Sequence, residues 1–151
     1  MGLLAGTCYD PAVAVTKATT ALLAMTALDT TNLRLTFTVP ASGTVLVRMQ
    51  GVIHGATTMP AILLGVLEGA TVKKRVSPIG GLKSTAVATA QVTQEASFVV
   101  TGLTPAANLT WDAAYGVEVI VAATGLKYGG PNNTTTNDAF GGFCYEVWSV
   151  D

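Results

Sequence analysis

The clearest alternation of apolar and polar positions along the chain lies in residues 33–50. Apolar residues alternate with Arg or Thr over residues 33–39, and a second alternation follows over residues 44–50. A period of two places each apolar set on one face of a β-strand. Pro40 and Gly43 suit the intervening turn, because proline presets φ and glycine tolerates a positive φ. The pattern therefore predicts a β-hairpin with a buried apolar face.

Short apolar runs separated by turn-forming residues continue along the rest of the chain. Residues 62–68 and 71–77 flank Glu68-Gly69 and predict a second hairpin. Further strands are expected at residues 84–92, 95–101, 109–111, 117–123 and 139–150. Loops are expected at residues 51–60, which contain His54, and at residues 124–138. Residues 16–28 combine helical spacing of apolar positions with many threonines, and we favour an edge strand there.

Many short strands at intervals of roughly 8 to 12 residues, without a clear helix, are typical of a β-sandwich or a jelly roll. We therefore expect one all-β domain over residues 12–151, an antiparallel β-sandwich of the jelly-roll type. Residues 1–11 are expected to form an irregular N-terminal arm. A chain of 151 residues buries about 68 to 70% of its unfolded surface, so a sizeable core is available.

Two features indicate that part of the outer surface is covered by another sheet or by another copy of the chain. Leu46 interrupts the polar face of its predicted strand. The terminal run carries large residues on both faces and would invite aggregation as an exposed edge. We expect it in the centre of a sheet or at a subunit interface. The residues predicted for this core or trimer seam are Phe140, Phe143, Tyr145 and Trp148.

Composition and charge narrow the function classes. Charged residues make up 11% of the chain, against a usual value of about 25%. The formal net charge of -1 provides no general attraction to nucleic acid or to an anionic membrane. Residues 1–14 contain no Lys or Arg, and no apolar run approaches the roughly 18 residues of a membrane span. We therefore expect a soluble protein without a signal peptide, nucleic-acid partner or membrane partner.

Cys8 and Cys144 are the two cysteines and lie near opposite ends of the chain. Disulfide frameworks of short secreted chains usually use four or more cysteines. A bridge would form if the two ends of the chain paired. We favour two reduced, partly buried thiols.

Two stretches carry a resemblance to known families. Phe37, Pro40 and Gly43 precede a strand, and Phe140, Gly142 and Phe143 lie in the terminal strand. This pair of motifs resembles core strands of the trimeric jelly-roll modules of the tumour-necrosis-factor and complement globular-head families. The Thr/Ala/Gly-rich chain is also similar to small structural proteins of tailed bacteriophages, which decorate capsids or tip fibres. The resemblance implies a homotrimer packed through an apolar, aromatic seam, and a place in the virion.

No pattern of residues matches a catalytic or metal-binding motif. His54 has no second ligand or assignable nucleophile in the sequence around it. The Gly80-Gly81 and Gly129-Gly130 pairs lack the spacing of a phosphate-binding loop. Carboxylates that calcium could in principle use are scattered along the chain, at Asp112, Glu118 and Asp138. We therefore expect no enzymatic activity, no cofactor and no bound metal.

Two surface features are candidates for binding. Basic residues cluster at Lys73, Lys74, Arg75 and Lys83. They either dock on an acidic capsid or tail surface or protect an edge strand from pairing, and the second interpretation is favoured. A predicted exposed loop carries Tyr128, Asn132, Asn133 and Asn137. It is either a carbohydrate-binding tip or a solvated crossing.

Taken together, these patterns predict a virion structural protein that is assembled in the host cytoplasm. We expect a capsid decoration (cement) protein that stabilises the shell as a homotrimer, with itself and the major capsid protein or another virion protein as partners. The alternative is a receptor-binding knob at a fibre or tail tip that recognises a host glycan.

Overall fold

The computed structural model describes residues 1–10, 15–18, 24–55, 62–77, 92–117, 125–128 and 142–151. These residues form eleven β-strands and no helix. The strands are β1 (Leu3–Tyr9), β2 (Val15–Ala18), β3 (Thr26–Ala27), β4 (Arg34–Thr38), β5 (Val45–Gly55), β6 (Ile62–Glu68), β7 (Thr71–Val76), β8 (Val92–Val100), β9 (Asn108–Val117), β10 (Gly125–Tyr128) and β11 (Phe143–Ser149).

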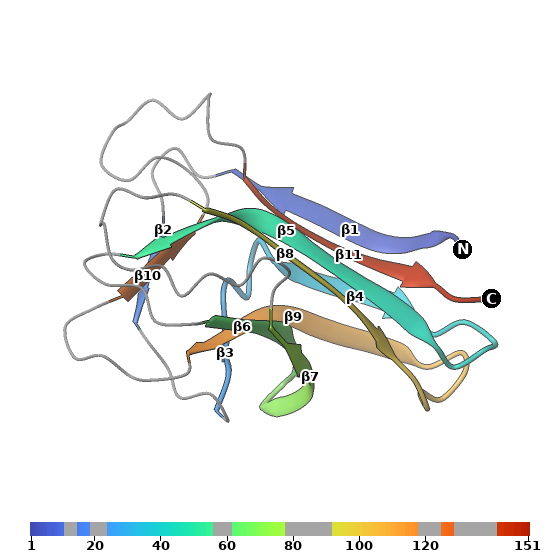
Figure 1. Ribbon diagram of the computed structural model, residues 1–151. Coiled ribbons are helices and arrows are strands. Elements are labelled where there is room, and N and C mark those ends of the chain that lie inside the picture. The colour runs from blue at the N-terminus through green and yellow to red at the C-terminus, as the bar shows by residue number, and fades with distance from the viewer. Residues whose placement is uncertain (11–14, 19–23, 56–61, 78–91, 118–124, 129–141) are drawn as a thin grey trace.

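The strands form two antiparallel sheets that pack against each other (Figure 1). Sheet A has six strands in the order β1-β11-β5-β10-β2, with β8 also paired with β5. Sheet B has five strands in the order β3-β9-β6-β7, with β4 paired with β9. The prediction of an all-β sandwich is therefore confirmed.

The predicted hairpin of residues 33–50 is wrong in its pairing. Its turn forms as expected, because the N–H of Gly43 donates to Pro40 O at 2.9 Å and Gly43 has a φ of 63°. However, β4 pairs with β9 in sheet B, whereas β5 pairs with β11 and β8 in sheet A. The turn thus carries the chain from one sheet to the other. Both strands still point their apolar residues into the core, so alternation alone does not distinguish the two arrangements.

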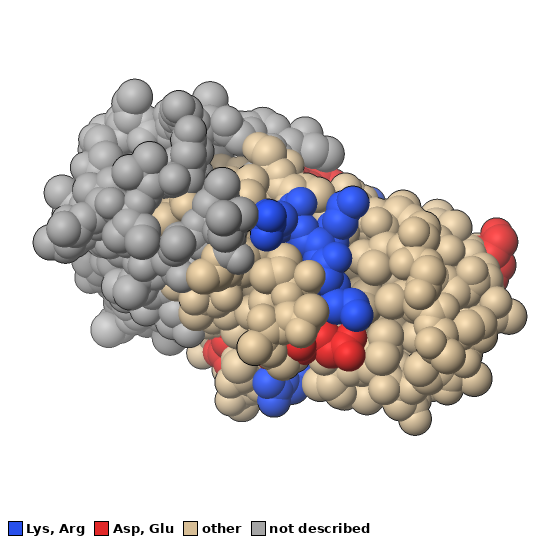
Figure 2. Space-filling view, turned by 90° about the horizontal axis from the view of Figure 1, so that it is seen from below, with Lys and Arg blue, Asp and Glu red and all other residues tan. Residues whose placement is uncertain are grey.

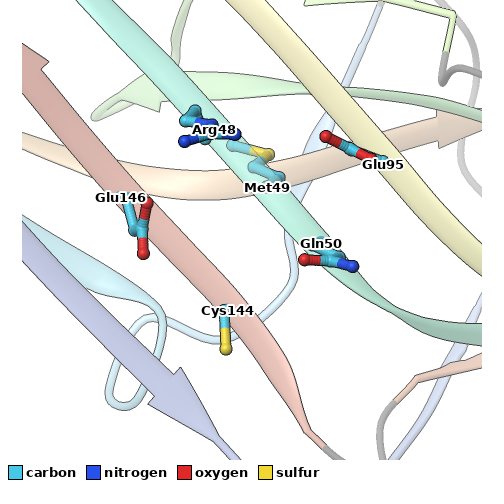
Figure 3. A pocket seen from close by; sticks show the side chains of 6 residues that line it. All are labelled: Arg48, Met49, Gln50, Glu95, Cys144 and Glu146. Carbon is cyan, nitrogen blue, oxygen red and sulfur yellow. The ribbon is translucent and has the colours of Figure 1, made fainter.

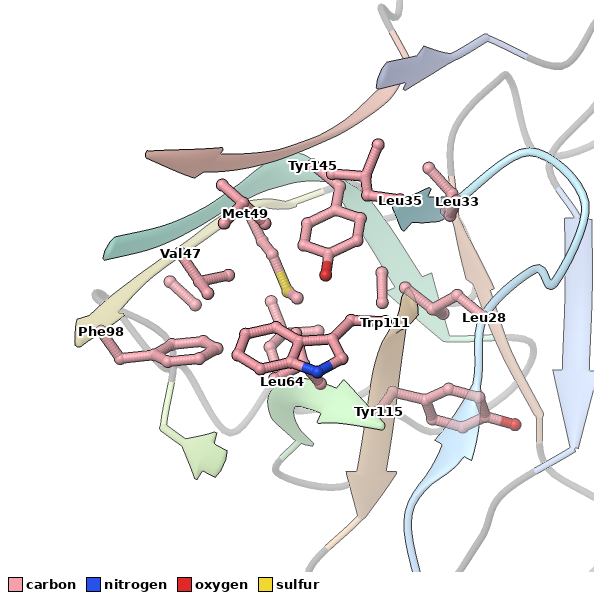
Figure 4. Close-up of a cluster of buried hydrophobic side chains, with 14 of the residues drawn as sticks. Leu28, Leu33, Leu35, Val47, Met49, Leu64, Phe98, Trp111, Tyr115 and Tyr145 are labelled. Atoms are coloured by element: carbon pink, nitrogen blue, oxygen red, sulfur yellow. The ribbon is translucent and has the colours of Figure 1, made fainter. Parts of the chain in front are cut away.

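The core lies between the inner faces of the two sheets (Figure 4). Phe37 and Trp111 meet edge to face with ring centroids 4.9 Å apart. Tyr145 points into the same space from sheet A. Gly51 is required opposite Phe143, because a Cβ there would overlap the Phe143 ring and lie 2.8 Å from its Cα. This close approach lets the large ring lie fully buried.

The N-terminal segment is a strand and not the irregular arm that the sequence predicted. β1 pairs with β11 over residues 3–9, and the N–H of Ser149 donates to Gly2 O at 2.8 Å. The register shifts between Leu3 and Ala5. This irregularity breaks the period of two, so the local sequence does not show the strand.

The same pairing joins the two cysteines. Cys8 and Cys144 are register partners with Cα atoms 4.0 Å apart, and they form a disulfide. The prediction of two reduced thiols is therefore wrong. The bridge depends on the pairing of the two ends of the chain, which cysteine spacing does not reveal.

Other predicted elements have mixed outcomes. The hairpin of β6 and β7 is confirmed, with Gly69 at a φ of 58°. β2 lies at the end of the sheet A order, which agrees with an edge strand. Residues 51–55 continue β5, so the loop predicted to begin at residue 51 is wrong there. β9 is one continuous strand over residues 108–117. The strand predicted at residues 84–92 lies outside the described residues except for its last position.

Candidate functional site

Four apolar residues cross the outer face of sheet A in one line. Leu3 pairs with Trp148, Trp148 with Leu46, and Leu46 with Val99. We call these four residues the apolar row. Leu3 and Val99 are 55% and 44% exposed, and the other two are half-buried. A line of exposed and half-buried apolar residues across a sheet face is a candidate interaction surface.

A shallow hollow of about 150 Å³ is lined by residues of β5, β8 and β11 (Figure 3). It lies beside the apolar row, because Arg48 and Glu146 follow and precede Leu46 and Trp148 by two residues on the same strands. Arg48 and Gln50 reach it from β5, Glu95 from β8 and Glu146 from β11. We call these four residues the charged cup. The indole Nε1–H of Trp148 donates to Glu146 Oε2 at 2.8 Å, which holds the ring beside the cup.

The cup has an excess of negative charge. Glu95 and Arg48 are exposed, and Glu146 is half-buried. Among the described residues, none of the three lies in an ion pair. Arg48 and Glu146 are cross-strand partners but form no ion pair, so two carboxylates and one guanidinium lie next to the apolar row with a net negative charge.

The predicted seam is divided between the core and the surface. Phe143 and Tyr145 are fully buried between the sheets. Trp148 lies on the outer face, in the apolar row. Phe140 lies outside the described residues. The expectation that the terminal strand is internal to its sheet is confirmed, since β11 lies between β1 and β5.

The predicted docking patch lies on β7, at the end of the sheet B order. Lys74 and Arg75 are exposed, and Figure 2 shows Lys and Arg side chains gathered beside acidic ones on this side of the molecule. Lys73 instead forms an ion pair with Glu68, with Nζ and Oε2 3.2 Å apart. The β6–β7 register shifts next to Lys73, whereas Lys74 and Arg75 pair regularly with Val66 and Gly65 and so point to opposite faces of the strand. Lys83 lies outside the described residues.

Glu68 connects this edge to the core. Its Oε2 accepts a hydrogen bond of 2.9 Å from the Nε1–H of Trp111. This bond and the nearby Lys73 ammonium lower the pKa of the Glu68 carboxyl, and the hydrogen bond is the larger cause. Lys73 therefore has a structural partner, and Lys74 and Arg75 are the cations that this strand presents to solvent.

The prediction that Tyr128 lies in an exposed loop is wrong. Tyr128 is in β10, is fully buried, and packs edge to face against Phe143 with ring centroids 6.0 Å apart. Its hydroxyl donates to Asp29 Oδ2 at 3.4 Å. Burial raises the pKa of the Tyr128 phenol, and the charge of Asp29 adds to this effect. Asn132, Asn133 and Asn137 lie outside the described residues.

The residues considered for chemistry are not brought together. The backbone of His54 lies in β5, opposite Lys127 of β10. Asp112 is buried and forms hydrogen bonds of 2.7 and 2.9 Å with the Arg34 guanidinium, so its carboxylate is already engaged. Glu118 and Asp138 lie outside the described residues. Over the part of the chain that the structure describes, no three His, Cys, Asp or Glu residues could hold a metal ion together.

Sequence reasoning found part of this surface and missed the rest. The sequence places Leu46 on the polar face of its strand and Trp148 in the core or trimer seam. It does not indicate Leu3 and Val99, because only the register across four strands aligns them. None of the described residues forms a helix that is long and apolar enough to cross a membrane. The chain matches no protein-family model, and it matches no curated protein.

Proposed function

We propose that this chain is a non-enzymatic structural protein that assembles with copies of itself through the outer face of sheet A. The observation that supports this proposal is the apolar row, which leaves Leu3 and Val99 largely exposed in the single chain. Burying apolar surface contributes about 25 cal/mol per Å², so covering the row favours association. The low charge of the chain, 11%, is consistent with a surface that is partly covered in the assembly.

We further propose that the assembly is a homotrimer that decorates and stabilises a tailed-bacteriophage capsid. This part rests on the resemblance of residues 37–50 and 139–148 to trimeric jelly-roll modules and on the similarity of the whole chain to phage structural proteins. Three copies that dock together act at a high effective concentration, which can raise avidity by about 10² to 10⁴. Weak single contacts with the major capsid protein then suffice.

A receptor-binding knob is the second candidate. The half-buried indole of Trp148 donates a hydrogen bond to Glu146, one of the carboxylates that line the charged cup. An aromatic ring with a few placed polar groups is the usual composition of a small-ligand site, and a sugar ring fits such a surface. In this alternative the cup binds a host glycan at a fibre or tail tip.

The experiment compares the wild-type chain with a Leu46→Thr/Val99→Thr variant. Thr keeps the β-branched shape that a strand favours and removes apolar surface from the row. Light scattering of the wild type should report three chains, and the variant should shift toward monomer with its fold intact. Thr36→Ser on the outer face of sheet B is the matched control and should assemble normally.

The capsid step is tested with particles that lack the protein. Purified trimer should bind in multiples set by the shell lattice and raise the temperature of genome release. Binding to host cells or glycans with no binding to bare shells would favour the knob. A monodisperse wild-type monomer at micromolar concentration would contradict self-assembly itself.

A further inference from the structure

We infer that the outer face of sheet A receives the basic edge strand β7 of a second copy of this chain. The inference deepens the proposed function, because it names the partner surface and rests on self-assembly. The two surfaces are the apolar row with its charged cup, on β1, β11, β5 and β8, and the exposed cations Lys74 and Arg75 on β7.

Symmetry requires two different surfaces for a ring of three. A face that packs on its own copy forms a two-fold pair, whereas a closed ring of three chains needs one patch of each chain to contact another patch of the next. In such a ring every chain contacts one neighbour through the outer face of sheet A and the other neighbour through β7. The area buried per chain is then the sum of both patches, which helps small faces reach the roughly 800 Å² per partner of a stable complex.

The charges of the two surfaces are complementary. The cup carries Glu95 and Glu146 against Arg48, a formal excess of one negative charge. On β7, Lys74 and Arg75 are exposed and lie in no ion pair with the described residues. Lys73 is already paired with Glu68. Lys74 and Arg75 lie on the two faces of one edge strand, and their charge therefore complements the net negative charge of the cup.

The dimensions of the two surfaces also match. β7 has six residues, and at about 3.3 Å per residue it spans roughly 17 Å. Four strands spaced by about 4.8 Å give the row a width of roughly 14 Å. Val72 and Val76 are half-buried on β7 because they pack within their own chain, Val72 against the cluster of Leu67 and Val76 against the main core. β7 is therefore long enough to lie across the row, and the charged groups that it presents there are Lys74 and Arg75.

The fold leaves β7 available for this contact in the part of the chain that the structure describes. There β7 pairs with β6 along one edge and with no second strand. The β7 cations and the cup carboxylates form no ion pair within the single chain among these residues. The complementary charges thus remain for an intermolecular contact.

Charge reversal in one chain tests this contact. The variants are Lys74→Glu/Arg75→Glu, Glu95→Lys/Glu146→Lys, and the combination of all four substitutions. Each pair alone places like charges across the contact and should raise the trimer dissociation constant about tenfold or more. The combined variant restores opposite charges and should return it to within about threefold of the wild type. Asp10→Lys, an exposed change outside both surfaces, is the control for net charge.

Sedimentation equilibrium at several salt concentrations measures these constants, and near-ultraviolet circular dichroism checks folding. If the variants fail to fold, the salt dependence of the wild-type trimer still tests the charge contact, because screened pairs weaken as salt rises. A wild-type trimer insensitive to salt and to both reversals would overturn this inference and leave self-assembly standing. A two-fold dimer would also overturn it. A wild-type monomer would overturn the proposed function as well.

Discussion

Leu46 on β5 and Trp148 on β11 are direct cross-strand partners on the outer face of sheet A. Phe143 lies on the same strand as Trp148 but points into the core, where it is fully buried. Phe143→Ala should therefore lower the free energy of unfolding by about 3 to 5 kcal/mol. Trp148→Ala should cost clearly less in the monomer, because the indole is already half-exposed there.

Urea unfolding of both variants, at a protein concentration below assembly, measures the difference. At a protein concentration that favours assembly, the difference between the two losses should become smaller, because Trp148→Ala then also removes contacts with a second copy. Equal costs in the monomer would mean that Trp148 is packed as tightly as a core residue.

The Cys8–Cys144 disulfide joins residues 136 positions apart. A cross-link over so long a loop lowers the entropy of the unfolded chain, and a Cys8→Ser/Cys144→Ser variant should lose about 2 to 5 kcal/mol. Hydrogen exchange should show the largest loss of protection in β1, because β11 is its only strand partner among the described residues. Unchanged stability and exchange after reduction of the wild type would contradict this role for the bridge.

Glu68 should make the free energy of unfolding depend on pH in the acid range. Its pKa is lowered in the folded chain, chiefly by the Trp111 hydrogen bond. A carboxyl with a lower folded-state pKa stabilises the fold fully above its unfolded pKa of about 4.3, and this stability is lost as the pH falls through the folded value. The side chain is 39% exposed, so we expect no more than about 1 kcal/mol.

The pH dependence of unfolding for Glu68→Gln measures this contribution. The variant should be less stable than the wild type at neutral pH, and the difference should shrink below about pH 4. Trp111→Phe keeps the carboxylate and removes the main donor, and NMR titration of Glu68 in that variant should show a higher pKa than in the wild type. A constant difference between Glu68→Gln and wild type across this pH range would contradict the assignment.

The hydroxyl of Tyr145 is buried and finds no hydrogen-bond partner among the residues that the structure describes. Burial raises the pKa of this phenol, and the charge of Asp112 adds to the effect, so the group is neutral at ordinary pH. Removing an unsatisfied buried hydroxyl avoids its desolvation cost, and Tyr145→Phe should stabilise the fold by about 1 kcal/mol. Tyr128→Phe is the matched control and should destabilise, because its hydroxyl donates to Asp29. Thermal unfolding of the two variants should shift in opposite directions.

Part of the outer face of sheet A was visible in the sequence. Leu46 interrupts the polar face of its predicted strand and the terminal strand carries large residues on both faces, and these two features predicted a covered surface. Leu3 and Val99 lie in line with Leu46 and Trp148 only because of the register across the four strands. Tyr128 illustrates the opposite case: its Gly- and Asn-rich surroundings predicted a loop, but β2 and β5 pair with its segment on either side and bury the ring.

The sequence by itself determined where most strands lie, which residues of each strand face the core, and where the chain turns at Gly43 and Gly69. These are local properties, set by the period of two and by the backbone freedom of glycine. Only the tertiary structure decided that β4 and β5 belong to different sheets, that β1 pairs with β11, and that Cys8 reaches Cys144. The physical reason is that a strand with one apolar face can pair with any strand of matching pattern and still bury that face. The choice among partners depends on how all the strands together close one core.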